Sequence, residues 1–335
     1  MAMIPSTLGA WIPAVLRCLK HHGLQKEDAI QLAGIDRTKL YEADARFSIH
    51  DTHQLMQLLQ KHVQRPVPGI ELAKFSDQTT FGALAFALNA SGSIREALQR
   101  LARFTPAIST VIQFSTEDRP DGLAVLIKEG MQATQTSRAT FDFCLAIVTV
   151  FLRQKGGRTA SPIQVMFKQA RDPESESVYE GFYGCKLVFE SEHYGLLVRH
   201  DALDAPILTP HSTETRASFD ELLLKAVEKV QQSPLVTQVL DLIVQGLPNG
   251  EPSLEDIASQ LNISGRTLQR RLKKENFLFK TLVDEGRKYL SQQYLQKDGY
   301  NVTETAYLLG FSDTSSFSRT YRRWFNQSPT ESTTT

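Results

Sequence analysis

SLEDIASQLNISGRTLQRRL (residues 253–272) and NVTETAYLLGFSDTSSFSRTYRRW (residues 301–324) repeat one pattern near the end of the chain. Each stretch opens with a helix-capping residue, Ser253 or Asn301, and continues into a short helix that contains a buried-type alanine. A turn follows at Asn262 or Gly310, two residue types that tolerate the left-handed backbone at a helix end. A second polar cap and a second helix complete the pattern, which predicts two helix-turn-helix units.

The second helix of each unit has an apolar face and a polar face. Apolar residues recur every three or four positions, namely Leu268 and Leu272 in the first unit and Phe317, Tyr321 and either Trp324 or Phe325 in the second. On the opposite faces we predict seven side chains that read base edges: Arg266, Gln269, Arg270, Thr314, Ser315, Ser318 and Arg319. The neighbouring basic residues are predicted to bind phosphates: Arg271, Lys273, Lys274, Arg322 and Arg323.

A helical pattern at 278–296 joins the two units. About 18 residues at 1.5 Å each give a rod of roughly 27 Å, and successive major grooves on one face of DNA lie about 34 Å apart. Gly286 interrupts the helical residue types and indicates close packing. A single basic amphipathic helix is usually just a solvated surface, whereas two copies joined by a rod predict binding to double-stranded DNA.

Residues 234–330 resemble the DNA-binding domain of the AraC/XylS family of bacterial transcription regulators. The resemblance rests on Ala306, Gly310-Phe311-Ser312, Phe317, Arg319, Phe325 and Ser328-Pro329. It implies an all-α fold with two helix-turn-helix motifs, and base-reading residues at the seven positions given above. After Ser328-Pro329 the family usually continues into a short final helix, whereas here residues 331–335 read as a frayed tail.

The composition shows that any positive charge available for binding DNA must be concentrated in one part of the chain. The chain has 335 residues, which suggests two domains, and its net charge is zero, so any attraction to DNA must be local. Residues 266–274 supply such a patch, with five basic residues and no acid. Three widely spaced cysteines, Cys18, Cys144 and Cys185, are typical of a reducing compartment, and neither a signal peptide nor a membrane span is expected. We predict a cytoplasmic protein with no membrane association.

The first part of the chain, residues 1–211, alternates helical and strand patterns and predicts an α+β domain. Expected helices include 48–63, 79–89, 93–104, 138–154 and a short one near 176–182. Expected strands include 110–115, 123–129, 163–168, 185–190 and 195–199, and a hairpin-like loop is expected at 117–122, between the first two strands. Residues 11–13, 81–82, 93–98 and 185–189 make this part resemble the arabinose-binding-like effector domain found in one branch of the AraC family. The resemblance implies a small-molecule sensor but not arabinose itself.

The sequence leaves the effector open. Phe81, Phe86, Phe104 and Phe141 are candidate pocket residues, although aromatic residues at helical spacing are more often core. Arg103, Arg138 and Arg153 are candidate carboxylate partners, although surface arginines are the commoner case. His50 and His53 lack a third ligand at a metal-like spacing, and neither a P-loop nor a nucleophile elbow is present. We therefore expect no metal, no cofactor and no enzymatic activity.

The combined prediction is a DNA-binding transcription regulator, activating through RNA polymerase, controlled by a small-molecule effector and acting as a homodimer. Its expected parts are an effector-binding and dimerisation domain (1–211), a linker helix (212–233), the DNA-binding domain (234–330) and a tail (331–335). An alternative keeps DNA binding but makes the first domain a ligand-independent dimerisation or protein-partner module.

Overall fold

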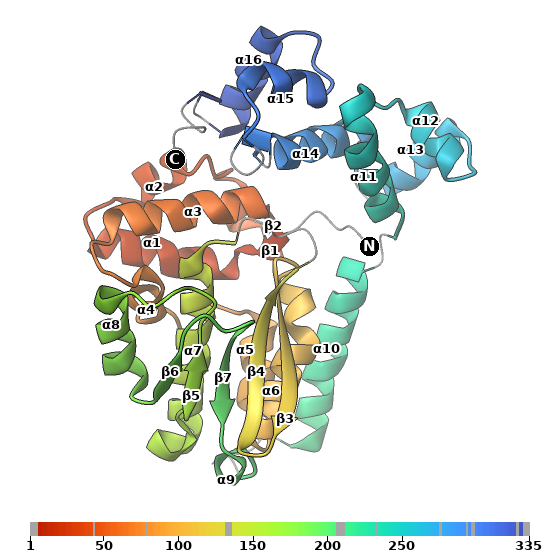
Figure 1. Cartoon of the computed structure of the whole chain (residues 1–335). Helices are drawn as coiled ribbons and strands as arrows, with labels where there is room; N and C mark the ends of the chain where they lie inside the picture. The colour runs from red at the N-terminus through yellow and green to blue at the C-terminus, as the bar shows by residue number, and fades with distance from the viewer. Residues whose placement is uncertain are drawn as a thin grey trace. The chain divides into compact units, whose positions relative to one another are not determined.

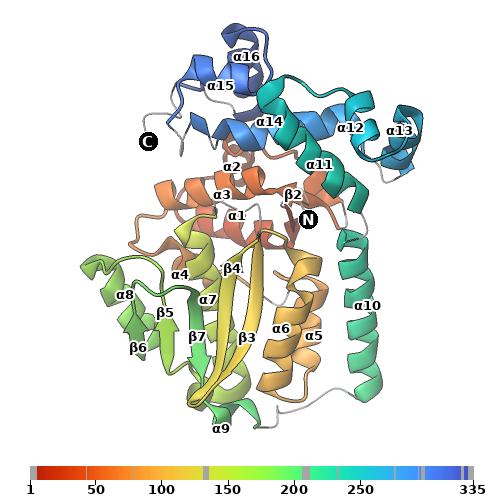
Figure 2. The same cartoon turned by 45° about the vertical axis from the view of Figure 1, so that its right-hand side comes forward.

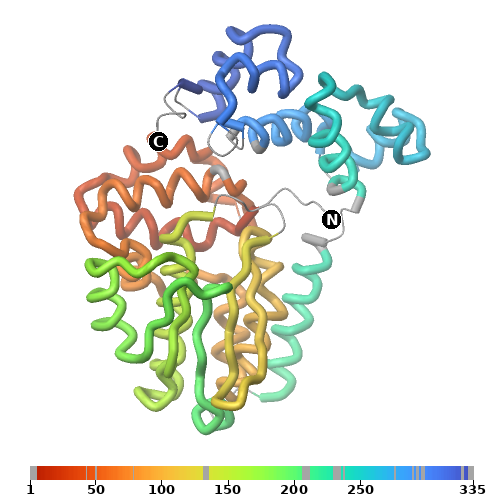
Figure 3. The backbone as a smooth tube through the Cα atoms, in the orientation of Figure 1, coloured from red at the N-terminus to blue at the C-terminus, as the bar shows by residue number. Residues whose placement is uncertain are grey.

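The computed structural model describes most of the chain, namely residues 6–42, 44–77, 79–130, 136–205, 212–231, 234–274, 277–292, 294–295, 299–325 and 328–330. The chain divides into two compact units, one that ends at Val230 and one that runs from Gln231 onward. The predicted tail at 331–335 lies outside the described residues. Figure 3 traces the backbone of both units.

The N-terminal unit combines helices with a sheet, as predicted. Its helices are η1 (Gly9–Trp11), α1 (Ile12–His21), α2 (Lys26–Leu32), η2 (Lys39–Tyr41), α3 (Ile49–His62), α4 (Pro68–Ala73), α5 (Ala83–Ala90), α6 (Ile94–Ile108), α7 (Arg138–Gly156), η3 (Gly157–Ala160), α8 (Pro173–Tyr183), α9 (His200–Leu203) and α10 (Thr213–Gln231). Its strands are β1 (Ser6–Leu8), β2 (Arg46–Ser48), β3 (Ile112–Arg119), β4 (Gly122–Glu129), β5 (Gln164–Met166), β6 (Lys186–Val188) and β7 (Tyr194–Val198).

Five strands form the main sheet in the order β3-β4-β7-β5-β6, in which only β5 and β6 run parallel. β1 and β2 form a separate antiparallel pair. Helix α6 packs on β3 and α7 on β7, so these two helices cover one face of the sheet (Figure 1). The apolar residues between helices and sheet make one large core, in which Phe104, Leu145 and Leu196 are fully buried.

Several predicted elements have different limits in the structure. The helix expected from residue 79 begins only at Ala83, because Gly82 adopts φ +53° and interrupts the helical path. The loop expected at 117–122 is a turn of two residues, since β3 continues to Arg119 and pairs there with Gly122. Helix α8 begins three residues earlier than expected, because Asp172 caps it and Pro173 suits the first helical position.

The C-terminal unit is all-α, as predicted. Its helices are α11 (Pro234–Gly246), η4 (Leu247–Asn249), α12 (Leu254–Gln260), α13 (Gly265–Lys274), α14 (Phe279–Gln292), α15 (Val302–Leu308) and α16 (Thr314–Phe325). In Figure 1, α14 runs between the α12–α13 pair and the α15–α16 pair. A single apolar core, which includes Ile243, Leu282 and Phe317, holds these helices together.

The connecting helix is shorter than the predicted rod. α14 contains 14 residues, or roughly 21 Å of helix, and Tyr294 and Leu295 beyond it lie in a π-helical turn. Close packing at Gly286 is confirmed, because a Cβ atom there would lie 3.1 Å from Ile243 Cγ2 of α11. Within the described residues, no helix has both the length and the apolar character that crossing a membrane requires.

Candidate nucleic-acid interface

The first helix of each motif begins with the same reciprocal cap. The Ser253 hydroxyl accepts a hydrogen bond from the Asp256 backbone N–H at 3.1 Å, and the Asp256 carboxylate accepts one from the Ser253 N–H at 3.1 Å. Asn301 and Glu304 repeat the arrangement at the start of α15, with both distances 2.9 Å. The hydrogen bonds from Ser253 lower the pKa of Asp256. Both predicted helix starts are therefore confirmed and are well defined.

The turn of each motif uses the left-handed backbone that the sequence predicts. Asn262 has φ +56° and Gly310 has φ +71°. At Gly310 the neighbouring chain also excludes a side chain, since a Cβ atom there would lie 2.7 Å from the Glu251 backbone nitrogen. Ala258 and Ala306 are buried beneath the second helices. Each motif is thus closed tightly between its two helices.

Helix α13, the second helix of the first motif, presents an unneutralised basic surface. Leu268 and Leu272 are buried, and the Ser264 hydroxyl caps the helix by accepting from the Thr267 N–H at 3.2 Å. Its five basic side chains are exposed and form no ion pair with any described residue: Arg266, Arg270, Arg271, Lys273 and Lys274. The helix contains no acidic residue to offset them.

Helix α16, the second helix of the second motif, is less charged and more aromatic. Phe317, Tyr321 and Phe325 are buried whereas Trp324 is only partly buried, so Phe325 completes the predicted apolar stripe. Asp313 caps the helix by accepting from the Ser316 N–H at 2.7 Å, and this hydrogen bond lowers the Asp313 pKa.

The structure places the predicted base-reading residues on the outer faces of α13 and α16. Arg266, Gln269, Arg270, Ser315 and Arg319 are exposed, whereas Thr314 and Ser318 are partly buried. The Arg319 guanidinium donates to the Ser316 hydroxyl at 3.3 Å, which restrains this side chain on its own helix. Among the residues predicted to bind phosphate, Arg322 and Arg323 of α16 are also exposed.

Arg287 of α14 is a central contact that the sequence reading missed. It is only 8% exposed, and its guanidinium donates to the carbonyl oxygens of Leu309 at 2.9 Å and Gly310 at 3.1 Å. The same group lies 2.8 Å from the Glu251 carboxylate and 4.5 Å from the ring centre of Phe311. Arg287 therefore joins the turn of the second motif to the segment that leads into the first.

Comparison with protein families identifies both parts of the chain. The model described as the arabinose-binding domain of AraC transcription regulators matches residues 23–207, and a helix-turn-helix domain model matches residues 257–334. The chain belongs to the AraC family of transcription regulators. It is therefore a DNA-binding regulator with an arabinose-binding-like N-terminal domain, and its relatives are not enzymes.

Two curated relatives match this AraC-family regulator over most of its length. The ornithine utilization regulator of Pseudomonas aeruginosa is 26% identical and covers 96% of this chain and 94% of its own. The transcriptional regulator VirS of Mycobacterium tuberculosis is 25% identical, and the match covers 86% of this chain and 85% of VirS. Among solved structures, the P. aeruginosa regulator CdpR matches with a TM-score of 0.46 and 19% identity, over 95% of this chain and 97% of that one.

The N-terminal unit of the regulator contains a cavity of about 500 Å³. Helices α5, α6 and α7 supply most of its lining. The rest comes from β1, Trp11, α3, β3 and residues of the connecting segments, namely Ser76, Asp77, Phe81, Ser109 and Val111. Of the four predicted pocket aromatics, Phe81 lines this cavity and its ring stacks on that of Phe143 at 6.1 Å between centroids. The volume is within the usual range of small-molecule sites.

The other three predicted aromatics do not line the cavity. Phe104 is fully buried in the core, and Phe141 stacks on Tyr194 with centroids 4.2 Å apart. Phe86 is 46% exposed and lies parallel to Phe219 of α10. Helical spacing alone could not separate these positions, because cavity-lining and core aromatics share the same period.

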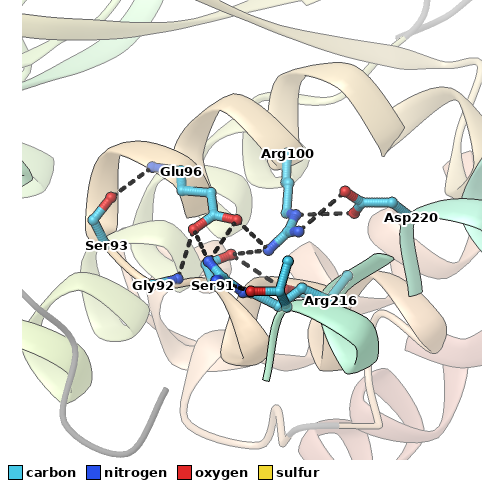
Figure 4. A network of polar contacts seen from close by, with 9 residues as sticks. Ser91, Gly92, Ser93, Glu96, Arg100, Arg216 and Asp220 are labelled. Atoms are coloured by element: carbon cyan, nitrogen blue, oxygen red, sulfur yellow. Dashed lines mark hydrogen bonds and ion pairs between the residues drawn. The ribbon is translucent and has the colours of Figure 1, made fainter. Parts of the chain in front are cut away.

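The linker helix α10 docks on the N-terminal unit through a charged network, which Figure 4 shows from close by. Arg100 of α6 is 7% exposed and forms two hydrogen bonds to the Asp220 carboxylate, at 2.9 and 3.0 Å. Glu96 of the same helix accepts from Arg216 of α10 at 3.1 Å. Figures 1 and 2 both show α10 alongside α5 and α6. The sequence predicts the helix but gives no sign of these partners.

Proposed function

We propose that the regulator reads a specific DNA sequence by placing α13 and α16 in successive major grooves. The seven exposed or partly exposed polar residues on these helices contact base edges, and the five flanking basic residues contact phosphates. The observation that carries the proposal is the presence of two capped motifs whose second helices turn basic faces outward. Major grooves accept a helix of this kind, and base edges there distinguish all four base pairs.

The proposal is tested by truncating one arginine on each helix. Arg270→Ala and Arg319→Ala should each weaken binding to the operator by about 1–3 kcal/mol and relax base preference at one position. The operator is first obtained by selecting sites from random duplexes with the full-length protein, and affinities are then measured by fluorescence anisotropy. Gln238→Ala, at an exposed position of α11 outside both recognition helices, serves as the control.

A variant that binds the selected site and random duplex as the parent does would contradict the groove assignment of its helix. If Arg270→Ala instead weakens both kinds of DNA equally, Arg270 contacts phosphate rather than a base. Selection that yields no preferred sequence would contradict sequence-specific recognition as a whole.

We further propose that a small molecule in the N-terminal cavity controls DNA binding through helix α6. One face of α6 lines the cavity with Ala97, Leu98 and Leu101. The same helix holds α10 through Glu96 and Arg100, and α10 leads along the chain into the DNA-binding unit. A ligand that fits better when α6 is displaced would change how α10 docks, and only this difference in affinity can shift the equilibrium.

The control mechanism is tested with Asp220→Asn, which removes the charge opposite the buried Arg100. DNA affinity of the parent should depend on the effector, and the variant should lose this dependence while still binding DNA. Lys225→Gln, at the exposed Lys225–Glu221 pair on the same helix, is the matched control. An effector response that persists unchanged in Asp220→Asn would contradict coupling through this network.

The family resemblance supports two further proposals, that the regulator activates transcription through RNA polymerase and that it acts as a homodimer. In vitro transcription from the selected operator tests the first, and sedimentation velocity tests the second. The cavity favours effector control over a ligand-independent N-terminal module. A metabolite screen by thermal shift distinguishes these two alternatives. A ligand that binds the folded protein raises the melting temperature, and the rise increases with the ratio of ligand concentration to Kd.

A further inference from the structure

We infer that the N-terminal cavity takes a neutral, hydrocarbon-rich molecule that carries a hydrogen-bond acceptor such as a carbonyl oxygen. The acceptor meets the indole N–H of Trp11 or the hydroxyl of Ser76. This inference rests on the proposed effector control, because it names the class of molecule that would exercise it.

The cavity wall is largely apolar, and most of its polar side chains are already satisfied. The hydroxyls of Thr52 and Thr105 donate to carbonyl oxygens of their own helices, those of Ser48 and Leu101. The amide of Asn89 donates in the same way to the Ala85 carbonyl, at 2.8 Å. The hydroxyl protons of both threonines and one amide proton of Asn89 are therefore already used within the protein, and most of the remaining wall offers hydrocarbon contact.

Two residues that line the cavity each carry a buried polar atom with no hydrogen-bond partner among the described residues. Trp11 is only 6% exposed, and its indole nitrogen finds no acceptor among the described residues. The buried hydroxyl oxygen of Ser76 is likewise without a partner there. Both residues line the cavity. Because buried donors are almost always hydrogen-bonded, an unpartnered indole N–H on a residue of the cavity wall points to an acceptor on the ligand.

The same wall disfavours sugars, amino acids and carboxylates. Its described lining contains one charged side chain, Asp77, whose carboxylate already binds the Arg17 guanidinium at 2.9 Å. Of the three candidate carboxylate partners, Arg138 and Arg153 bind Tyr179 and Tyr183, and neither these two nor Arg103 lines the cavity. A buried ligand charge would therefore remain uncompensated, as would most hydroxyls of a sugar.

The inference is tested by isothermal titration of the full-length protein with four probes. These are the neutral ketone 2-nonanone, the carboxylate nonanoate of the same chain length, L-ornithine and L-arabinose. We expect saturable binding of 2-nonanone and at least ten-fold weaker binding of the other three. Trp11→Phe or Ser76→Ala should weaken ketone binding about five-fold, the value of one neutral hydrogen bond.

A cavity-filling variant, Ala85→Phe, places the binding in this cavity and should abolish it, with circular dichroism confirming that the variant folds. Failure of every ketone from 2-hexanone to 2-tridecanone to bind would overturn the inference. So would binding of L-ornithine or L-arabinose that Ala85→Phe removes. Retention of full ketone affinity in both Trp11→Phe and Ser76→Ala would overturn the acceptor assignment.

DNA affinity, measured in the same samples, separates this inference from effector control. If a ketone binds in the cavity and operator affinity does not change, the ligand class holds and effector control fails. If operator affinity responds to L-ornithine but no ketone binds, effector control holds and the ligand class is wrong.

Discussion

The two helix-turn-helix motifs share one backbone plan and stabilise it by different means. The first motif has an asparagine at its left-handed turn residue, and the basic side chains of α13 project outward without ion-pair partners among the described residues. The second has a glycine at that position, and the turn around it is held by the buried Arg287. Its helix carries hydroxyls and an arginine restrained by Ser316.

The difference indicates that the motifs contribute unequally to DNA binding. The exposed cations on α13, which have no ion-pair partner among the described residues, are expected to supply attraction to phosphates, which acts at a distance and is screened by salt. A pre-organised α16 loses less conformational freedom on binding, so its short side chains can discriminate between bases at low entropic cost. We therefore expect changes to the scaffold to affect the second motif more, and changes in salt to affect the first more.

The largest effect should come from Arg287→Met. The substitution keeps an apolar stem of similar length but leaves the Leu309 and Gly310 carbonyls without their donor and removes the contact with Phe311. We expect the C-terminal unit to lose about 3 kcal/mol of unfolding free energy, measured by calorimetry of the full chain, with a larger loss of specific than of non-specific DNA binding.

Lys288→Met is the matched control, because it changes the next residue of the same helix to the same side chain. Among the described residues Lys288 forms one ion pair, with the partly exposed Glu285 one helical turn away, so its loss should cost less than about 0.5 kcal/mol. Equal destabilisation by the two variants would show that Arg287 has no special role in joining the motifs.

The sequence predicts the local architecture of both motifs because local rules govern it. Three kinds of feature can be recognised from neighbouring residues alone. They are the helix caps at Ser253 and Asn301, the left-handed turn residues Asn262 and Gly310, and the apolar stripes of period 3.6. Arg287 was missed because its partners are 22 to 36 positions away, although it lies four residues after the buried Val283 and three before the buried Leu290. A basic residue on an apolar stripe is the signal that would have found it.

Less of the N-terminal unit can be predicted from the sequence, for the same reason. Its fold class follows from alternating helical and strand patterns, yet the cavity is built where the consecutive helices α5 and α6 meet α7 and residues as far away in the chain as Trp11. Of Phe81, Phe86, Phe104 and Phe141 only the first reaches that cavity. Periodicity shows which face of a helix is buried but not whether another side chain or a cavity lies against it.

A smaller effect should separate the turns of the two motifs. Gly310→Ala forces an L-residue into φ +71° and brings its Cβ to 2.7 Å from the Glu251 nitrogen, so we expect a loss of about 2 kcal/mol in unfolding free energy. Asn262→Gly, at the equivalent place in the first motif, should change it by less than about 0.5 kcal/mol, because both residue types accept this conformation.

Thermal denaturation of the full-length variants, followed by calorimetry, measures both changes. The contrast between the turns would be lost if Gly310→Ala were as stable as the parent. It would also be lost if Asn262→Gly were the more damaging change, since the first turn would then depend on contacts of the asparagine side chain.

The smallest effects, and the sharpest test of unequal charge, concern the predicted phosphate contacts. The slope of log K against log salt concentration should fall by about 2.7 when the three residues on α13 (Arg271, Lys273 and Lys274) are changed to alanine. It should fall by about 1.8 when the two on α16 (Arg322 and Arg323) are changed. Each single change, such as Lys274→Ala, should reduce affinity for operator and random duplex alike, because phosphates carry no base identity. Anisotropy titrations across a salt series give both slopes.

A larger fall in the slope for the α16 pair would mean that the second motif, despite its hydroxyl-lined face, supplies more of the electrostatic attraction. Selective loss of operator binding in Lys274→Ala would instead place that lysine against a base.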